Sequence, residues 1–412
     1  MKKYALTFAA VSMSLLSLSA AEPEVGKPLP MWEKGYLDIH AINTGRGECS
    51  FYIFPDGTTM LVDAGESNGH TPNLVAQKPD TVTRPYETYT KYIQHFLPKE
   101  NRQIDYMMLT HFHMDHSGDV YPGNPAAKDG RPYVLTGLTG VGDAIPFKKV
   151  IDRGYPDYKT PIEPISKAFP NYLSFITWHK ENKGVEIERF CPGKTDQIVL
   201  THNPGEYPTF QVRNIAANGV VWTGVEDVTR DYFVPSKYLK NKADLPDENQ
   251  CSIVFRLSYG PFDYFSGGDL PAVTTHDWQC LEVPVGTVTG PVEAMKSNHH
   301  MNYDAMGVPL LKALRPQVVV VHNAKAQQPD IEVLRRIQSN VRAYAGKKAV
   351  FSTNEHPATK FIAYPNTEKM PARQGHIVIR VLPGGEKFYV YALEDGDFSY
   401  KVKSVHGPYK CK

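Results

Sequence analysis

Short apolar runs that alternate with helical patterns and turn-forming residues set the pattern of this chain. Residues 36–65 read as strand-like runs joined by a glycine loop and a Pro-Asp-Gly turn. Residues 86–97 have the spacing of a helix that stops before Pro98, and residues 104–110 form a continuous apolar run, as expected of a strand covered on both faces. This alternation of strands and helices predicts an α/β fold.

The stretch from residue 120 to residue 248 is long and less regular than the rest. We expect it to carry an insertion beside the core, with a lid as one interpretation. Within it, residues 166–184 have the spacing of a helix that ends at Gly184. Short strands are expected at four further runs: 133–140, 185–190, 197–201 and 209–215.

The second half of the chain returns to short, strongly apolar segments. Residues 251–269 predict a pair of strands that ends in an acid, residues 317–323 a buried strand, and residues 330–345 a helix. From Gly375 to the end, the pattern is rich in strands. Because the potential ligand residues described below fall just past strand ends, we expect an α/β sandwich with a site along one edge of its sheets.

The first 21 residues have the pattern of a secretory signal peptide. Lys2 and Lys3 precede an apolar stretch over residues 5–18, and small residues follow at 19–21. This stretch is too short and too rich in serine for a spanning helix, and an uncleaved membrane anchor is the alternative. No later segment approaches the roughly 20 apolar residues that a transmembrane helix needs. We therefore expect a periplasmic or secreted protein that is soluble after cleavage.

Charge and cysteine content argue against some partners and sites. Cleavage removes two positive charges, Lys2 and Lys3, so the formal net charge moves from +1 to −1. A near-neutral protein has no overall field that attracts long nucleic acid. Five cysteines leave at least one unpaired, and none has the spacing of a zinc ribbon, which disfavours a cysteine-based metal site. The disulfide pairing and the oligomeric state stay open.

The richest chemistry lies directly after the apolar run 104–110, where the sequence reads His-Phe-His-Met-Asp-His. His111 and His113 are two residues apart on a segment that leaves a strand, so their rings can converge on one ion. Asp115 and His116 follow on a tight turn and can face a second ion beside the first. Imidazole together with carboxylate suits Zn²⁺, Fe or Mn²⁺. A polar loop with chance histidines is the alternative, and the density of ligand residues argues against it.

This motif is the His-x-His-x-Asp-His hallmark of the metallo-β-lactamase superfamily, which the chain resembles. Within the superfamily it looks most like the hydrolase domain of the competence protein ComEC, because further segments resemble that group's motifs in the same order: Asn43–Gly65, Asn249–Asp269 and Lys296–Asn302. The resemblance runs from about Tyr36 to about Tyr364. It implies an αββα sandwich with a metal site at its top, with one hydrolase domain over residues 22–365. Residues 366–412 would be a strand-rich extension packed on the same domain.

The resemblance also implies a role for each matching residue. The ligands implied for the first metal ion are His111 and His113. Those implied for the second are Asp115 and His116, and Asp269, which follows a strand, matches the carboxylate that bridges the two ions. One or two divalent ions, zinc or manganese, are the implied cofactors.

Two adjacent histidines, His299 and His300, match the remaining positions. One is expected to complete the second metal site and the other to face substrate. We prefer His300 as the ligand, because other superfamily members place this ligand directly before a glycine, whose place Met301 takes here; the reverse assignment stays open. Asp63 is implied as the acceptor that fixes the tautomer of a ligand imidazole, with a plain strand-end cap as the alternative.

Two features depart from the pattern of the superfamily. Asn249 stands where many members supply a third histidine to the first metal site, as in the ComEC group, so that site would be poor in ligands and would fill weakly or favour Mn²⁺. His202 is an alternative ligand, although its surroundings resemble a surface turn, and His322 at a strand end is a further candidate to line the site. Met301 and Asn302 replace Gly-Ser, which bears on contacts with substrate.

A two-metal site of this kind predicts hydrolysis. Such ions would share a water, lower its pKa towards about 7, and stabilise the charge that develops on the substrate. Asp115 would orient the nucleophile or carry its proton, and the histidine that is not a ligand, His299 in our assignment, would protonate the leaving group. The resemblance favours a phosphodiester, and we expect the substrate to be a small molecule or a short phosphodiester. A cyclic amide or ester, as in β-lactamases and lactonases, and a degenerate member that only binds ligand are the alternatives.

Overall fold

The computed structural model describes residues 23–68 and 72–412. The predicted signal peptide over residues 1–21 lies outside the described residues, so it stays an expectation. Among the helices of the described part, none is long and apolar enough to cross a membrane.

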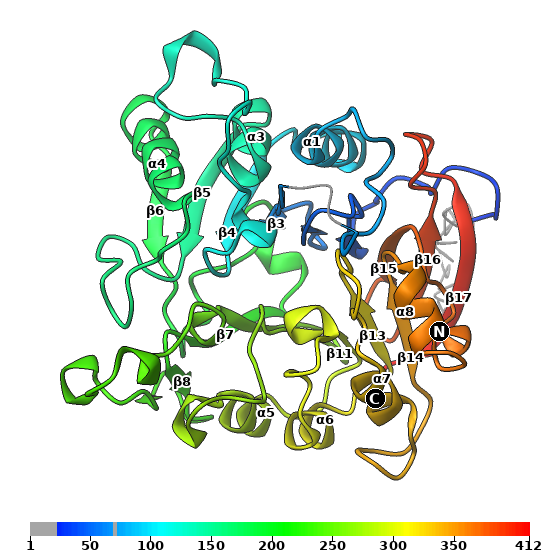
Figure 1. Cartoon of the computed structure of the whole chain (residues 1–412). Helices are drawn as coiled ribbons and strands as arrows, with labels where there is room; N and C mark the ends of the chain where they lie inside the picture. The colour runs from blue at the N-terminus through cyan, green and yellow to red at the C-terminus, as the bar shows by residue number, and fades with distance from the viewer. Residues whose placement is uncertain (1–22, 69–71) are drawn as a thin grey trace, which may run out of the picture.

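Two large β-sheets form the centre of the molecule (Figure 1). The strands of the first sheet are β1 (Leu37–Ala41), β2 (Ser50–Ile53), β3 (Thr59–Val62), β4 (Ile104–Leu109), β5 (Phe147–Asp152), β6 (Glu186–Arg189), β15 (His376–Val381), β16 (Lys387–Leu393) and β17 (Val402–Lys410). Those of the second are β7 (Phe210–Ala217), β8 (Val220–Trp222), β9 (Thr229–Asp231), β10 (Val254–Tyr259), β11 (Phe262–Ser266), β12 (Ala294–Lys296), β13 (Val318–Val321) and β14 (Ala349–Ser352). Their orders are β17-β16-β15-β1-β2-β3-β4-β5-β6 and β14-β13-β12-β11-β10-β7-β8-β9.

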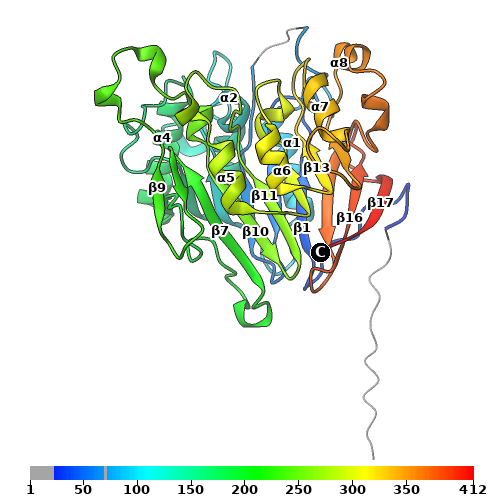
Figure 2. The same ribbon diagram turned by 90° about the horizontal axis from the view of Figure 1, so that it is seen from below.

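Helices lie on the outer side of both sheets. The α-helices of the described residues are α1 (Pro85–Phe96), α2 (Met114–Ser117), α3 (Gly137–Ala144), α4 (Phe169–Lys183), α5 (Glu282–Thr289), α6 (Val308–Leu314), α7 (Ile331–Gln338) and α8 (Pro357–Ile362). Figure 1 shows α1, α3 and α4 along one side of the molecule and α5, α6 and α7 along the opposite side. In the turned view of Figure 2, α5 and α6 lie over strands of the second sheet.

The strand pattern explains these layers, because successive side chains of a strand point to opposite faces. In β4, Met107 and Leu109 pack in a core with residues of α1 and α3, whereas Tyr106 and Met108 pack in a second core between the two sheets. A third core lies between the second sheet and α5, α6 and α7, where Met295 of β12 is buried. The order helix, sheet, sheet, helix confirms the predicted α/β sandwich.

Several predicted elements are confirmed. The helix and the strand predicted on either side of Pro98 are α1 and β4. The helix predicted over residues 166–184 is α4, and Gly184 ends it with a left-handed backbone at φ 68°, which a residue without Cβ adopts readily. The helix predicted over residues 330–345 is shorter, because α7 ends at Gln338.

Two of the predicted strands are wrong. Residues 133–140 lead into α3, at whose start the Thr139 hydroxyl accepts a hydrogen bond from the Thr136 N–H at 3.1 Å. Residues 197–201 form no strand. There the side chain of Tyr106 takes the place of a strand partner, since its hydroxyl donates to the Val199 carbonyl at 3.0 Å and accepts from the Val199 N–H at 3.2 Å.

The expected insertion is narrower than residues 120–248. β5 and β6 of the first sheet and β7, β8 and β9 of the second lie within this range, so the range adds strands to both sheets. Two of its connecting segments, residues 153–168 and 232–253, contain no strand. These two segments form the walls of a groove that is described below.

The C-terminal strands continue the first sheet beyond β1. β15 pairs antiparallel with β1 from Leu37↔Val381 to Ala41↔Ile377, and β16 and β17 follow. A buried ion pair joins the two strands, with Arg380 Nε 2.8 Å from Asp38 Oδ1. The C-terminal segment is thus held by strand pairing and by a side-chain contact to the same sheet.

Candidate metal centre

Strand ends deliver the predicted ligands to one edge of the molecule. β3 and β4 run parallel, so Asp63 after β3 and His111 after β4 emerge at the same edge. The short helix α2 then carries His116 beside Asp63. In the second sheet, Asp269 follows β11, and His300 lies in a short turn after β12, which runs parallel to β11.

A buried cluster of His116, Asp269 and His300 forms the centre of the site. Asp269 Oδ2 lies 3.0 Å from His116 Nε2 and 3.2 Å from His300 Nε2. The two imidazole nitrogens are 3.3 Å apart. Together with Glu48, these residues place one ligand atom each within 4.8 Å of one another. Such a set of nitrogen and oxygen atoms fits one metal ion.

Hydrogen bonds on the far side of each ring determine where the protons are. His300 Nδ1 lies 2.9 Å from the backbone carbonyl oxygen of His322, which can only accept, so Nδ1 carries the proton. His116 Nδ1 in the same way donates to Asp63 Oδ2 at 2.8 Å. The Nε2 atoms of both rings therefore present lone pairs to each other and to the Asp269 carboxylate. Three electron-rich atoms at these distances repel one another unless a cation lies between them.

The pKa of His116 also indicates that the position between the two rings favours a positive charge. Burial disfavours the charged imidazole, but the carboxylates of Asp269 and Asp63 outweigh burial and raise the pKa of His116 well above its ordinary value. The position between the rings thus attracts either a proton or a metal ion.

Glu48 and Lys296 form a buried ion pair behind the cluster. Lys296 Nζ lies 3.0 Å from Glu48 Oε2 and 3.5 Å from Asp269 Oδ1. Burial raises the pKa of the Glu48 carboxyl. Within the described residues, Glu48 Oε1 and Asp269 Oδ1 have no hydrogen-bond partner, and Glu48 Oε2 has only the ion-pair contact with Lys296. Buried carboxylate oxygens without partners suit a divalent cation, so the residues present fit the metal that the motif implies.

His111 and His113 lie beside this cluster. His111 Nε2 is 3.2 Å from His113 Nδ1 and 3.9 Å from Asp269 Oδ2. The Thr110 hydroxyl donates to Asp63 Oδ2 at 2.7 Å, so it accepts from His111 Nδ1 at 3.1 Å, which leaves His111 Nε2 unprotonated. Asp269 Oδ2 thus faces ring nitrogens of three histidines. This geometry is compatible with the bridging role predicted for Asp269, which stays a prediction.

Asp115 lies at the rim of the cluster, in contact with a lysine. Its Oδ2 is 2.9 Å from Lys325 Nζ and 3.7 Å from His300 Nε2. Burial disfavours ionisation of Asp115, but Lys325, together with His116 and His300, holds the pKa of this carboxyl well below its usual range. Asp115 is therefore an ionised carboxylate beside the metal position.

The adjacent histidines diverge within the turn Asn298–Met301, in which both have a left-handed backbone. His300 enters the cluster. His299 is partly exposed, with Nδ1 2.8 Å from Asp304 Oδ1 and Nε2 3.3 Å from Asn249 Nδ2. The structure therefore brings His300 to the other ligand atoms and places His299 beside Asn249, as our preferred assignment expects; the ligation itself stays a prediction.

Two other candidate histidines have separate places. His202 is exposed, and its ring Nε2 lies 3.8 Å from Asp105 Oδ2. Asp105 lies at the start of β4 and His111 just after its end, so the structure does not bring His202 to the cluster. His322 is buried and contacts the site through its backbone carbonyl, which accepts from His300.

Three charged residues of the site were not predicted as site residues: Glu48, Lys296 and Lys325. The first two stand inside segments that resemble superfamily motifs, and a charge next to apolar strand residues was the signal available for both. Lys325 lies in a polar stretch, and its contact with Asp115 joins residues 210 positions apart. Only the fold brings that pair together.

Comparison with known proteins gives one family match. Residues 44–122 match the model of the metallo-beta-lactamase superfamily. No curated protein sequence matches this chain.

The chain is also similar to several solved structures. A mutant of CmlA beta-hydroxylase is similar with a TM-score of 0.41 and 13% identity, covering 86% of this chain and 55% of the other, so the chain spans about half the length of that protein. Zn(2+)-bound PqqB from Methylobacterium extorquens has a TM-score of 0.40 and 11% identity, covering 76% of this chain and 98% of the other. Unliganded yeast PDE1 has a TM-score of 0.33 and 10% identity, covering 84% of this chain and 99% of the other.

The matched residues 44–122 contain the whole His-x-His-x-Asp-His motif, together with Glu48 and Asp63. The remaining members of the cluster, Asp269 and His300, come from the second sheet, which packs face to face with the first. Residues 44–122 thus match the metallo-β-lactamase superfamily, and the two-sheet α/β architecture of the chain is consistent with the sandwich fold of that superfamily.

Proposed function

We propose that this protein is a metal-dependent hydrolase that acts on small phosphodiesters. The observation that carries the proposal is the meeting of Asp269 Oδ2 with the Nε2 atoms of His116 and His300, whose Nδ1 atoms both donate elsewhere. When bound at such a position, divalent metal ions polarise a substrate oxygen and lower the pKa of a water. Zinc and manganese are the metals that we propose for this set of imidazole and carboxylate ligands.

The surrounding side chains can perform the steps that a hydrolysis needs. Asp63 and the His322 carbonyl hold two of the imidazoles in the tautomer that leaves Nε2 free. Asp115, kept ionised beside Lys325, can orient a water for attack and accept its proton.

His299 is placed to serve the leaving group. Its Nδ1 faces Asp304, and its Nε2 points towards Asn249 at the exposed side of the cluster. Asn249 Nδ2 can only donate, so His299 Nε2 faces it as an acceptor. Once Nε2 is protonated, the imidazole can deliver that proton to an oxygen that departs from the substrate. The Asn249 amide lies where it can hydrogen-bond to the same group.

A cavity beside the metal centre has room for a small substrate or for an extended one. A cavity of about 660 Å³ reaches His113, a size that suits a small molecule. The preference for a phosphodiester rests on the ComEC-like order of motifs, which is an analogy between sequences. The pattern of the first 21 residues supports export, so we propose that the reaction takes place in the periplasm or outside the cell.

A substrate panel tests the proposal. Protein purified without chelator is assayed with bis(p-nitrophenyl) phosphate, nitrocefin and a lactone, each with added Zn²⁺ or Mn²⁺. We expect hydrolysis of the phosphodiester that disappears on metal removal and returns on metal addition. The Asp269→Asn variant, which has nearly the same volume, is the matched control and should be inactive.

Other outcomes would replace the proposal. Preferential cleavage of nitrocefin or of the lactone would make a cyclic amide or ester the substrate. Metal binding without turnover of any of the three would favour a member that only binds its ligand.

A further inference from the structure

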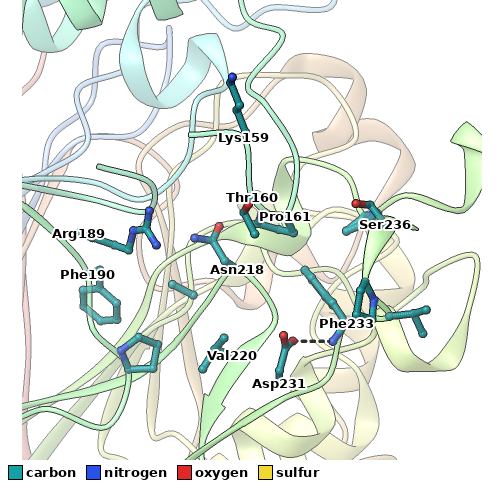
Figure 3. A pocket seen from close by; sticks show the side chains of 15 residues that line it. Lys159, Thr160, Pro161, Arg189, Phe190, Asn218, Val220, Asp231, Phe233 and Ser236 are labelled. Atoms are coloured by element: carbon teal, nitrogen blue, oxygen red, sulfur yellow. Dashed lines mark hydrogen bonds between the residues drawn. The ribbon is translucent and has the colours of Figure 1, made fainter. Parts of the chain in front are cut away.

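A second cavity, of about 300 Å³, adjoins the cavity at His113. The two cavities share four lining residues, which belong to the strand-free segments 153–168 and 232–253: Lys159, Pro161, Ser236 and Pro246. Both cavities are therefore lined by these two segments, and we call the two adjoining cavities together the 159–246 groove. It runs from His113 at the metal centre to the second cavity, whose lining Figure 3 shows.

The part of the groove next to His113 is mainly apolar. Phe112, Ile162, Ile165 and Leu245 line it, and Ile165 is 97% exposed. Charged residues of both signs lie along the same part: Lys159, Lys242, Glu163, Asp247 and Glu248. An apolar wall that leads away from a metal centre suits an alkyl or aryl portion of a ligand.

The far cavity contains a guanidinium that is held by carbonyl groups. Arg189 Nε donates to the Tyr155 carbonyl at 3.0 Å, and Nη2 donates to the carbonyls of Gly154 at 2.9 Å and Asp157 at 3.0 Å. Within residues 23–68 and 72–412, Arg189 forms no ion pair, and its Nη1 makes no hydrogen bond. Figure 3 shows Arg189 reaching towards Asn218 on one wall, with the ring of Phe190 beneath it. A fixed guanidinium with a free N–H edge is a binding site for an anion.

The charge balance of the far cavity is positive. Lys159 stands at the junction of the two cavities, and in the described part of the chain it forms no ion pair. The one acid that lines the far cavity is Asp231, whose carboxylate accepts a hydrogen bond from the Phe233 N–H at 3.0 Å. Two cations and one carboxylate leave a net charge of about +1, which matches a singly charged ligand group better than a doubly charged one.

We infer that the 159–246 groove binds a substrate with two ends. The reacting phosphodiester lies at the metal centre, an apolar portion lies along Ile162 and Leu245, and a distal carboxylate pairs with Arg189 and Lys159. The inference rests on the proposed function for the near end of this ligand, and on the groove alone for the distal carboxylate.

Matched probes test the distal site by binding, without turnover. Zinc-loaded, full-length protein is titrated calorimetrically with two series of phosphonates of increasing alkyl length, one ending in a carboxylate and one in a methyl group. At the length that spans the groove, the carboxylate series should bind about 10- to 100-fold more tightly, as expected for one charge-assisted contact. Arg189→Gln should abolish this preference. Arg335→Gln, at an exposed arginine of α7, is the matched control and should keep it.

Two further variants separate binding from structure, because Arg189 also holds the carbonyls of residues 154–157. Lys159→Gln changes an exposed side chain and should reduce the preference several-fold. Asp231→Asn keeps the acceptor for the Phe233 N–H but removes the carboxylate charge, so it should strengthen binding of the carboxylate series. A merely structural role for these residues predicts no such opposite changes.

Equal affinity of the two series at every length, or no binding of either, overturns the distal site. A preference that survives in both Arg189→Gln and Lys159→Gln overturns it as well. Hydrolysis of bis(p-nitrophenyl) phosphate by the same preparation reports separately on the proposed function. Hydrolysis without a carboxylate preference therefore leaves the proposed function standing, and a carboxylate preference without hydrolysis leaves the distal site standing.

Discussion

Asp63 has a left-handed backbone at φ 59°, which residues with a Cβ adopt at a cost of about 1–3 kcal/mol. Its carboxylate accepts hydrogen bonds from the Thr110 N–H at 2.8 Å, from the Thr110 hydroxyl and from His116 Nδ1. Through these contacts one carboxylate sets the tautomer of His116 directly and that of His111 through Thr110. The strained backbone of Asp63 thus lies where its carboxylate fixes the direction of the Nε2 lone pairs of His116 and His111.

The two adjacent histidines should separate metal binding from turnover. His300→Ala should lower the metal content, because His300 Nε2 lies 3.2 Å from Asp269 Oδ2. His299→Ala should keep the metal but reduce turnover about 10²–10⁴-fold, if His299 acts as the proton donor to the leaving group. Metal analysis beside activity measurement of the two variants is the test.

The exposed His202 provides the control for this pair, and His202→Ala should match the wild type in both measurements. Loss of metal from His299→Ala with retention in His300→Ala would reverse the two roles. If both variants keep their metal, neither histidine is a ligand and the cluster described here does not hold the ion.

At the scale of elements, a buried ion pair joins segment 232–253 to the strand end that carries the motif. Arg153 after β5 donates from Nε and Nη2 to the two oxygens of Glu248, each at 2.6 Å. Glu248 Oε1 also accepts from the Phe112 N–H at 2.9 Å. The backbone between His111 and His113 is therefore held by a residue of the groove wall.

Breaking this contact should affect both stability and metal binding. Glu248→Ala leaves Arg153 buried without its partner, so unfolding free energy should fall by about 3–5 kcal/mol. The Phe112 N–H also loses its acceptor, which should weaken metal binding by His111 and His113. Urea unfolding and metal titration measure the two effects.

Asp227→Ala, which removes an exposed ion pair with Lys194, is the matched control and should leave both quantities nearly unchanged. Glu248→Gln keeps an acceptor for the Phe112 N–H and should retain more metal than Glu248→Ala. Wild-type stability in Glu248→Ala would show that the pair does not hold the segment.

The elements that sequence alone predicted are those whose pattern is local. The apolar run of β4, the spacing of α1 and the glycine that ends α4 each follow from neighbouring residues. The strand predicted over residues 133–140 was wrong because a helix cap decides that segment, and the strand over 197–201 was wrong because Tyr106, about 90 positions earlier, binds its backbone. Tertiary contacts of this kind override local propensity.

In the candidate site, too, the local pattern could be predicted from the sequence, whereas the contacts made by the fold could not. The motif from His111 to His116 is contiguous, so its chemistry was visible in the sequence. Glu48 and Lys296 pair across 248 positions, and neither residue alone indicates its partner. The nearness of His300 to His116 likewise depends on how the two sheets pack.

At the scale of the whole molecule, buried neutral histidines make stability depend on pH. Burial lowers the pKa of His376 to about 3 and that of His179 to about 4. Both groups have a folded pKa below the unfolded value of about 6.5, so their stabilising contribution is complete above pH 6.5 and is lost as the pH falls. At pH 5 the His376 contribution alone should have fallen by about 2 kcal/mol.

Urea unfolding of wild type and His376→Gln between pH 7.5 and pH 5 checks this expectation. The variant should show a shallower loss of stability as the pH falls, because one fewer proton is taken up on unfolding. His202→Gln controls for the loss of an exposed imidazole. Parallel pH profiles for wild type and His376→Gln would contradict the assignment of a neutral, buried His376.

The central claim concerns the cation between His116, His300 and Asp269, and metal content tests it most directly. Protein purified without chelator, from medium to which no Zn²⁺ or Mn²⁺ is added, is analysed by mass spectrometry for metals beside Asp269→Ala. In that variant Glu48 still pairs with Lys296, so the fold should persist, as circular dichroism can verify. We predict at least one zinc or manganese ion per wild-type chain, fewer than two because Asn249 stands where the superfamily resemblance implies a histidine ligand, and almost none in Asp269→Ala. A folded wild type without metal, or an Asp269→Ala variant with full occupancy, would contradict the account.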